Sequence, residues 1–379
     1  MKWKIPLSDI DIGKDEIGEV TKVLRSKWLS MGPVTEKFED EFAKHFQVKH
    51  AIAVSNGTAA LHLALVSLGI GENDEVICPS LTFVATANSI ICAGATPVFA
   101  DITSLSDINI SPESIKTRIT TKTKAITVVH YGGYPCDMDA IMAIAEKEGL
   151  KVIEDAAHAP GAEYNGRKLG TIGDVGCFSF FSNKNMVTGE GGMVVTNDDL
   201  IAERIKRIRS HGMTALTWHR HKGHASRYDV LEVGYNYRID EMRSALGIVQ
   251  LKKLNGYNEK RRKIVKKYIE LLEGIPGVFI PFRNHQGKSS YHLFPIMVAD
   301  PLHRGCLINH LKESGIQSSI HYPPIHKFLA FRKRFPGVEL PKTEFVGDCE
   351  LTLPLYPGLH GTDLVYIVER IRESINRIS

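Results

Sequence analysis

A lysine in an apolar stretch has the surroundings that most favour covalent chemistry in this sequence. Lys184 lies in the segment CFSFFSNKNMVTGEGGMVV, which is rich in apolar residues and contains no second basic residue. Most lysines are solvated surface charges, but desolvation lowers the pKa of an amine and makes it nucleophilic. Lys184 is therefore our candidate for an amine that forms an imine with a carbonyl compound.

A carboxylate and an imidazole follow the apolar run KVIED. Asp155 ends that run, and His158 lies three residues further on, where it could reach the same ligand. A carboxylate at this point could cap a helix, bind a metal or hold the protonated nitrogen of a heterocycle. A capping or turn role is the commonest one for a single aspartate, so the residues alone leave these roles open.

The segment SNGT provides a candidate phosphate site. Asn56, Gly57 and Thr58 follow a predicted strand and open a predicted helix. Small residues there let backbone N–H groups and the positive end of the helix face a phosphate. The same residues also suit a simple N-capping turn, and the motif does not choose between the two.

Two serines and one arginine could add anion contacts. Ser179 and Ser182 flank the lysine segment and could donate hydroxyl hydrogen bonds to a phosphate, or could be buried and bonded locally. Arg238 could pair with an anionic ligand, or with Asp240 or Glu241 at the start of a helix.

Other ligand motifs do not fit. The segment GTIGDVG at 170–176 has the wrong spacing for a dinucleotide loop, and the sequence has no P-loop signature. His219, His221 and His224 lie in the polar segment WHRHKGH without a second cluster of ligands. We therefore expect neither a plain dinucleotide oxidoreductase nor a metal site.

The elements between residues 50 and 200 predict an α/β fold. Apolar strands are expected at 51–55, 75–79, 97–101, 125–130, 151–155, 177–181 and 193–196, and helices at 59–69, 82–92 and 138–149. Strands that alternate with helices indicate a mostly parallel sheet covered on both faces. Ligands of such sheets bind at the carboxyl ends of the strands, where Gly57, Asp155 and Lys184 are expected.

The remaining residues predict a second, smaller α/β domain. The stretch from Asp240 to Gly274 predicts a long helix, a kink near Gly256 and a second helix. Strands at 291–298 and 316–322 and a final helix follow. We place the boundary near residue 250, with a large domain at 1–250 and a small domain at 251–379.

Composition favours a cytoplasmic protein without a nucleic-acid or membrane partner. The net charge of +4 comes from 47 basic and 43 acidic residues, which is too balanced to indicate such a surface. We find no leader-like or membrane-spanning apolar run. The six cysteines lack a C-x-x-C pair, and we interpret them as buried, reduced thiols; they are Cys78, Cys92, Cys136, Cys177, Cys306 and Cys349.

The ordered motifs resemble those of the DegT/DnrJ/EryC1/StrS family of sugar aminotransferases, which depend on pyridoxal 5'-phosphate (PLP) and have transferase fold type I. The resemblance runs almost end to end, and its motifs include SNGTAALHLAL, VIEDAAHAPGAEYNGRKLG, FSFFSNKNMVTGEGGMVVTND, GYNYRIDEMRSALGIVQLKKL and IHYPPIH. It implies a mostly parallel seven-stranded sheet between helices in the large domain.

The resemblance also implies roles around the cofactor. Lys184 matches the lysine that forms an imine with the PLP aldehyde, and Asp155 matches the aspartate that bonds the pyridine nitrogen. Gly57 and Thr58 match the phosphate-binding turn, and Ser179 matches a phosphate-binding serine.

Three further positions match cofactor contacts. Phe83 matches an aromatic residue that stacks on the ring, and Asn236 matches an asparagine that reaches the phosphate of a neighbouring subunit. The resemblance therefore implies a homodimer with shared sites. His158 stands where many members have a glutamine beside the phenolic oxygen of the cofactor; both side chains can donate a hydrogen bond.

The substrate side and the reaction follow from the same resemblance. Arg238, His321 and Tyr322 match regions that line the substrate. The nearest subgroup aminates C4 of UDP-linked 4-keto sugars, which implies ping-pong transfer of an amino group from L-glutamate to a nucleotide-linked keto sugar in polysaccharide or lipopolysaccharide biosynthesis. Alternatives are a PLP-dependent sugar dehydratase, a cyclitol aminotransferase or a PLP-binding regulator. Dehydratases of the family replace the lysine with histidine, so Lys184 favours amino transfer.

Overall fold

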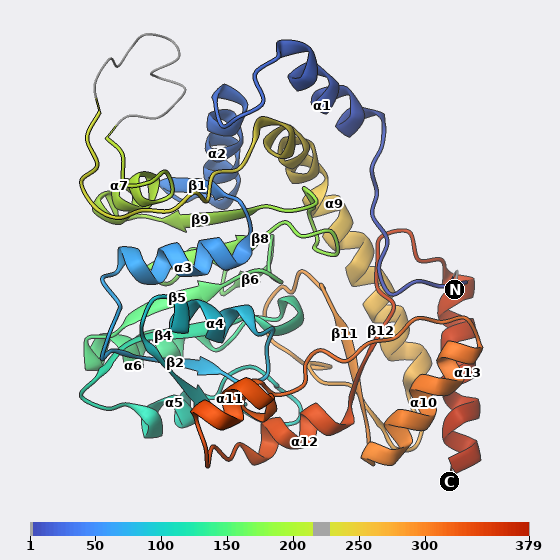
Figure 1. Cartoon of the computed structure of the whole chain (residues 1–379). Coiled ribbons are helices and arrows are strands. Elements are labelled where there is room, and N and C mark those ends of the chain that lie inside the picture. The colour runs from blue at the N-terminus through green and yellow to red at the C-terminus, as the bar shows by residue number, and fades with distance from the viewer. Residues whose placement is uncertain (1–2, 215–227, 379) are drawn as a thin grey trace.

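Two sheets organise the chain (Figure 1). The computed structural model describes residues 3–214 and 228–378. Within them seven strands form one sheet in the order β1-β9-β8-β5-β4-β2-β3, and three strands form another in the order β10-β11-β12. The strands of the large sheet are β1 (His50–Val54), β2 (Glu75–Pro79), β3 (Thr96–Ala100), β4 (Thr123–Val129), β5 (Lys151–Asp155), β8 (Val175–Ser179) and β9 (Gly192–Thr196). A short hairpin, β6 (Glu163–Tyr164) and β7 (Arg167–Lys168), lies apart from it.

The large sheet is mostly parallel, as predicted. The pairs β2–β3, β2–β4, β4–β5 and β5–β8 are parallel. Only β9 is reversed, because it pairs antiparallel with both β1 and β8. The strands β1, β2, β5 and β8 therefore all end at the same edge, where ligands of parallel sheets bind.

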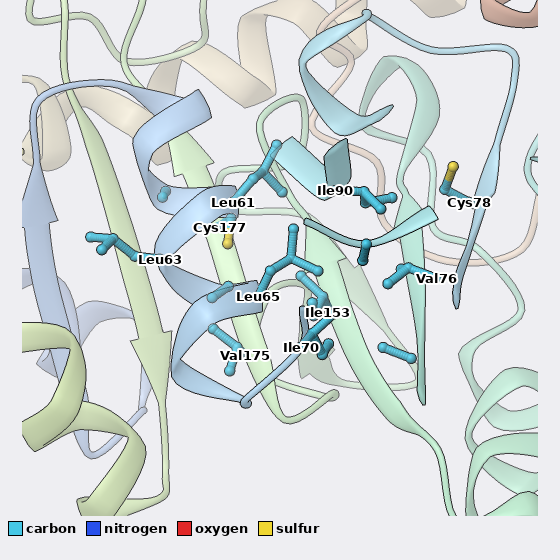
Figure 2. Close-up of a cluster of buried hydrophobic side chains, with 14 of the residues drawn as sticks. Leu61, Leu63, Leu65, Ile70, Val76, Cys78, Ile90, Ile153, Val175 and Cys177 are labelled. Atoms are coloured by element: carbon cyan, nitrogen blue, oxygen red, sulfur yellow. The ribbon is translucent and has the colours of Figure 1, made fainter. Parts of the chain in front are cut away.

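Helices cover both faces of this sheet. Alternate residues of a strand point to opposite faces, and Ile52 and Val54 of β1 pack with α3, α4 and α7, whereas Ala51 and Ala53 pack with α2 and α9. Leu61 and Leu65 of α3 lie beside Ile153, Val175 and Cys177 of the sheet (Figure 2). The helices of this part are α1 (Lys14–Ser26), α2 (Pro33–Phe46), α3 (Gly57–Ser67), α4 (Ala85–Cys92), α5 (Pro112–Arg118), α6 (Met138–Glu148) and α7 (Asp199–Ile208), with a short 3-10 turn at Tyr131–Gly133.

A cluster of phenylalanines joins α2 to the sheet. Phe42 is fully buried and stacks on Phe46 with ring centroids 4.3 Å apart. It also meets the rings of Phe178 and Phe180, at 5.2 and 5.8 Å. Phe178 and Phe180 flank Ser179, so this cluster supports the strand end that leads to Lys184.

One long helix connects the two parts of the chain. α9 (Glu241–Leu272) is continuous, so the predicted kink near Gly256 and the division into two helices are wrong. A Cβ on Gly256 would meet nothing within 4 Å, so this glycine marks no close contact. At Gly247 a Cβ would lie 2.5 Å from the Phe38 ring, so this glycine allows α9 to approach α2.

The C-terminal part packs a small antiparallel sheet against helices. Its elements are β10 (Val278–Phe279), β11 (Phe294–Val298), α10 (Pro301–Glu313), a 3-10 turn at Ile325–Lys327, α11 (Leu329–Arg334), α12 (Pro341–Cys349), β12 (Glu350–Leu353) and α13 (Gly361–Ile378). One buried cluster gathers apolar side chains from the second half of α9 and from β11, α10, β12 and α13. The predicted boundary near 250 falls within α9 and stays a prediction.

Several sequence predictions need correction here. The segment 316–322 was expected to be a strand, but it contributes only single bridges, from Ile316 to Ile5 and from Ser319 to Thr352. The helix expected from Thr82 begins at Ala85. All six cysteines are free, but Cys92 and Cys306 are exposed, and Cys92 lines a cavity at the carboxyl edge of the large sheet. Over the described ranges, no helix combines the length and the apolar character that crossing a membrane requires.

We expect Phe42→Ala to lower the free energy of unfolding by about 3–5 kcal/mol, because it leaves a cavity among the four phenylalanine rings that Phe42 contacts. Denaturant unfolding followed by tryptophan fluorescence measures this loss. Phe42→Leu, which keeps most of the volume, should cost clearly less. Equal losses for both variants would show that packing at this position does not stabilise the fold.

Candidate active site

The predicted site residues gather around one cavity at the carboxyl edge of the large sheet. The cavity has a volume of about 660 Å³, which is the size expected for a cofactor or small-ligand site. Nine of the predicted residues line it: Gly57, Thr58, Phe83, Asp155, His158, Ser179, Lys184, His321 and Tyr322. They come from the ends of β1, β2, β5 and β8 and from the C-terminal part, so folding brings together distant segments.

Asp155 is the buried carboxylate of this cavity. It is the last residue of β5 and is 5% exposed. Burial raises its pKa, while the Thr86 hydroxyl, 2.8 Å away, the Ala157 N–H, 3.2 Å away, and the Lys184 amine oppose that rise by favouring the carboxylate. Asp155 can therefore hold a cation inside the cavity. Thr86 was not found from the sequence, because a threonine within a helix gives no local sign of what it contacts.

Lys184 is the amine of the same cavity. It follows β8 in a turn, and its backbone N–H donates to the Phe181 carbonyl over 2.9 Å. Burial lowers the pKa of Lys184 to about 8, against the opposing attraction of Asp155. A lysine with such a pKa is partly neutral near pH 7, so the amine can act both as a nucleophile and as a proton carrier.

The neighbouring Asn185 fixes the turn that carries Lys184. Its side-chain amide donates to Asn258 of α9 over 2.8 Å and to the Ser290 carbonyl over 2.7 Å. Its carbonyl oxygen lies 3.1 Å from Nδ1 of His292. Two segments distant in sequence, around Asn258 and at 290–292, therefore hold the backbone next to the lysine.

The end of the cavity at α3 is suited to a phosphate. Asn56 caps the helix by accepting the Ala59 N–H over 2.8 Å. In the described part of the chain, the N–H groups of Gly57 and Thr58 have no acceptor. A Cβ on Gly57 would lie 2.8 Å from Cβ of Ser179, so the glycine allows the helix end and the serine to lie together. Free N–H groups at a helix N-terminus form an anion site.

His158 and Tyr322 form another part of the cavity wall. The buried His158 accepts the Gly132 N–H at Nδ1 over 3.4 Å, and its Nε2 lies 3.1 Å from the Tyr322 hydroxyl. Burial lowers the pKa of His158 well below its usual value, and the nearby amine of Lys184 lowers it further. The ring is therefore neutral and offers an Nε2–H. The ring of His292, 4.5 Å away, was missed from the sequence, although a histidine at the start of an apolar strand is a usable signal.

His321 and Tyr322 reach the cavity from the C-terminal part. The Tyr131 hydroxyl donates to the His321 carbonyl, and the His321 N–H donates to the buried Glu350 over 2.8 Å. Tyr131 and Glu350 were also missed from the sequence, because each contacts this segment only through the tertiary fold.

Asn236 and Arg238 lie away from this cavity. Neither residue lines it, although Tyr237 between them does. Asn236 is exposed. The Arg238 Nη1 is buried without a hydrogen-bond partner in the described residues, and burial and the nearby Arg209 lower the pKa of its guanidinium.

The other predicted candidates do not line the cavity or lie outside the described residues. The Ser182 hydroxyl donates to the Gly189 carbonyl over 3.3 Å and is not among the cavity residues. Within the described ranges, no three His, Cys, Asp or Glu side chains are grouped so as to hold a metal ion. His219, His221 and His224 lie outside the described residues.

This fold and this cavity define the chain as an α/β protein with a buried lysine and a buried aspartate at the carboxyl edge of its large sheet. The chain belongs to the DegT/DnrJ/EryC1/StrS aminotransferase family, whose profile matches residues 10–372. The predicted family, the transferase fold type I and the assignment as a sugar aminotransferase are thereby confirmed.

Individual relatives agree with this family. The spore coat polysaccharide biosynthesis protein SpsC of Bacillus subtilis is 41% identical over 99% of this chain and 97% of its own length. PseC of Helicobacter pylori, an aminotransferase involved in pseudoaminic acid biosynthesis, has a TM-score of 0.92 at 30% identity, over 98% of this chain and 99% of its own. Spr1654 of Streptococcus pneumoniae, a proposed sugar aminotransferase solved in its PLP form, has a TM-score of 0.92 at 29% identity, over 99% of both chains.

We expect the Lys184 amine to react with an acylating reagent with a midpoint near pH 8 in the cofactor-free protein, because only the neutral amine is nucleophilic. Asp155→Asn should move the midpoint to lower pH, since it removes the charge that favours the ammonium form. Mass spectrometry of the labelled peptides measures the extent of acylation against pH in the wild type and in Asp155→Asn. A midpoint near that of free lysine, about pH 10, would contradict the buried environment.

Proposed function

We propose that the protein transfers an amino group from L-glutamate to a nucleotide-linked keto sugar, using PLP held by Lys184 and Asp155. The observation that carries this proposal is that the Lys184 amine and the buried carboxylate of Asp155 line one cavity, where burial lowers the pKa of the amine to about 8. SpsC and PseC, by name, act in polysaccharide and pseudoaminic acid biosynthesis, which supports a sugar as the amino acceptor.

The residues present fit PLP. The free N–H groups of Gly57 and Thr58, with Ser179 beside them, would hold its phosphate. Asp155 would bond its ring nitrogen, and Phe83, a residue that is 56% exposed and lines the cavity, offers a ring on which the cofactor can stack. When bound, PLP supplies a carbonyl carbon for an amine and a ring that accepts an electron pair.

The chain's own groups then position charges and move protons. The Asp155 carboxylate keeps the ring nitrogen protonated, because a buried anion stabilises a cation beside it. The Lys184 amine takes the proton from Cα of the amino donor and later returns it, as base and then acid. His158, neutral and with an Nε2–H, can donate to the phenolic oxygen of the cofactor.

A ping-pong order follows from the use of one cavity for both half-reactions. Glutamate would pass its amino group to the cofactor, take a keto oxygen from water and leave as 2-oxoglutarate. The keto sugar would then take up that amino group, lose its keto oxygen as water and leave as an amino sugar. Arg238, His321 and Tyr322 are proposed for the substrate side; of these, His321 and Tyr322 line the cavity. We propose C4 of a UDP-linked 4-keto sugar as the first acceptor to test, and a cytoplasmic location stays a prediction.

The function is tested with PLP-loaded protein, 15N-labelled L-glutamate and a panel of UDP-, dTDP- and GDP-linked 4-keto sugars. We expect the label in a sugar amine and equimolar 2-oxoglutarate. Lys184→Ala should lower turnover by more than about 10²-fold, since it removes the proton carrier. Lys147→Ala is a matched control, because Lys147 is 82% exposed and lies near the end of α6, just before the start of β5. A dehydrated sugar, or amination of cyclitols alone, would overturn the proposal.

We also propose a homodimer in which Asn236 reaches the cofactor phosphate of the second copy. Asn236 is exposed and lies outside its own cavity, and the segment before it exposes Val230, Leu231 and Val233. An exposed apolar segment beside a polar side chain suits an interface between copies.

Mixed dimers test this sharing. Lys184→Ala and Asn236→Asp should each be nearly inactive alone, the second because a carboxylate repels a phosphate. Mixing and reassociating the two should restore part of the activity, since one of the two sites in a mixed dimer then has neither substitution. Turnover per mixed dimer is measured after separation with two affinity tags. If activity does not return, Asn236 does not serve the second copy.

A further inference from the structure

His321 forms part of the cavity wall, and a buried glutamate, Glu350, lies behind it. Glu350 is the first residue of β12 and is fully buried, and Thr352, two residues on, is 1% exposed. The two carboxyl oxygens have different partners. Oε2 accepts the His321 backbone N–H over 2.8 Å, and Oε1 contacts the Thr352 hydroxyl. The proposed function gives Glu350 no role.

The threonine connects this carboxyl group to the imidazole of His321. Thr352 Oγ1 lies 2.9 Å from Nδ1 of His321. A hydroxyl has one hydrogen, so it can donate to only one of its two neighbours. The direction of this donation fixes which ring nitrogen of a neutral His321 carries the proton.

The ionised glutamate sets one direction. A carboxylate can only accept, so Thr352 donates to Oε1 of Glu350 and accepts from Nδ1–H of His321. The neutral ring then has a bare Nε2, which is a hydrogen-bond acceptor. Nε2 has no protein partner among the described residues, and His321 lines the cavity.

The protonated glutamate sets the opposite direction. Because Oε2 already accepts the His321 N–H, the proton lies on Oε1 and is donated to Thr352. Thr352 then donates to Nδ1 of His321, and the neutral ring carries its proton on Nε2. The same nitrogen becomes a hydrogen-bond donor.

Both states of Glu350 are accessible near neutral pH. Burial raises the pKa of Glu350 to about 8, against the opposing effects of the Thr352 hydroxyl, the His321 N–H and Arg304 of α10. Two phenols, of Tyr131 and Tyr322, also face it, and their pKa values are raised, chiefly by burial. Burial and the Lys184 amine lower the pKa of His321 to about 4, so its ring stays neutral while Glu350 titrates.

We propose that Glu350, acting through Thr352, sets the tautomer of His321 in the cavity, so that Nε2 is a donor when Glu350 is protonated and an acceptor when it is ionised. Glu350 is thus a positioning residue, which acts through His321. The link to the substrate rests on the proposed function: the protonation state of Glu350 decides whether His321 can bind a keto sugar. A keto oxygen only accepts hydrogen bonds, so it needs the Nε2–H and hence the protonated Glu350.

Nitrogen spectra of the cofactor-free protein test the tautomer directly. With 15N-labelled histidine, two-bond 1H–15N correlations show which ring nitrogen is protonated, and His321→Gln assigns the signals. We expect His321 to change from Nε2–H to Nδ1–H as the pH rises through about 8. Without cofactor or substrate, this result does not depend on the enzyme's activity.

Three variants make the test specific. Glu350→Gln should keep Nε2–H at every pH, because the amide donates to Thr352 while its carbonyl accepts the His321 N–H. Thr352→Val should also abolish the pH-dependent change, since it breaks the connection while Glu350 remains. Glu344→Gln is the matched control and should retain the change, because Glu344 bonds a different histidine, His326. A wild-type tautomer that does not change, or one that still changes in Glu350→Gln, would overturn the proposal.

Kinetics test the link to the substrate. The KM for the keto sugar should rise about 3- to 10-fold above pH 8, which is the effect of one neutral hydrogen bond, with little change in kcat. In Glu350→Gln, the KM should stay flat at the low value. A wild-type KM that stays flat while the tautomer changes would overturn the substrate link, whereas absence of amino transfer with a changing tautomer would refute the proposed function alone.

Discussion

The candidate site depends on the burial of two opposite charges in the wall of one cavity. Burial favours the neutral form of each group, lowering the pKa of Lys184 and raising that of Asp155, and the attraction between them opposes both effects. The amine is thereby left near its point of half-protonation. A fully solvated lysine would stay protonated at neutral pH, so its amine could act neither as a nucleophile nor as a base.

The sheet produces this arrangement through its strand directions. The carboxyl ends of β1, β5 and β8 lie at one edge, and the reversed β9 lets the chain return from the lysine turn beside β8. Long-range hydrogen bonds from Asn185 to α9 and to residue 290 then fix that turn. The C-terminal part completes the cavity with His321 and Tyr322. The geometry of the site is therefore a property of both parts of the chain.

The sequence predicted the parts of the site that depend on local pattern. Asp155 ends an apolar strand and Gly57 and Lys184 follow two others, and the end of a parallel strand predicts where such residues meet. Contacts made by the C-terminal part, such as those of Glu350, leave no local pattern, and this residue was missed. The helix around Gly256 shows the converse error: packing with α1, α2 and α13 keeps α9 continuous, although a glycine alone favours a break. Helix propensity is a weaker constraint than burial of a long apolar face.

Two fully buried glutamates show why only one of them can respond to pH near neutrality. Burial alone would raise the pKa of Glu154, but His130 and the N–H groups of Gly173 and Gly170 outweigh it, so its pKa lies below the usual value. Glu350 has fewer donors, and there burial prevails. Glu154 therefore stays an anion that fixes the loop after β7, whereas Glu350 can exchange its proton while it remains buried. The number of donors that the fold supplies, rather than the depth of burial, decides which carboxyl group is a permanent anchor and which can change the hydrogen bonding of the cavity.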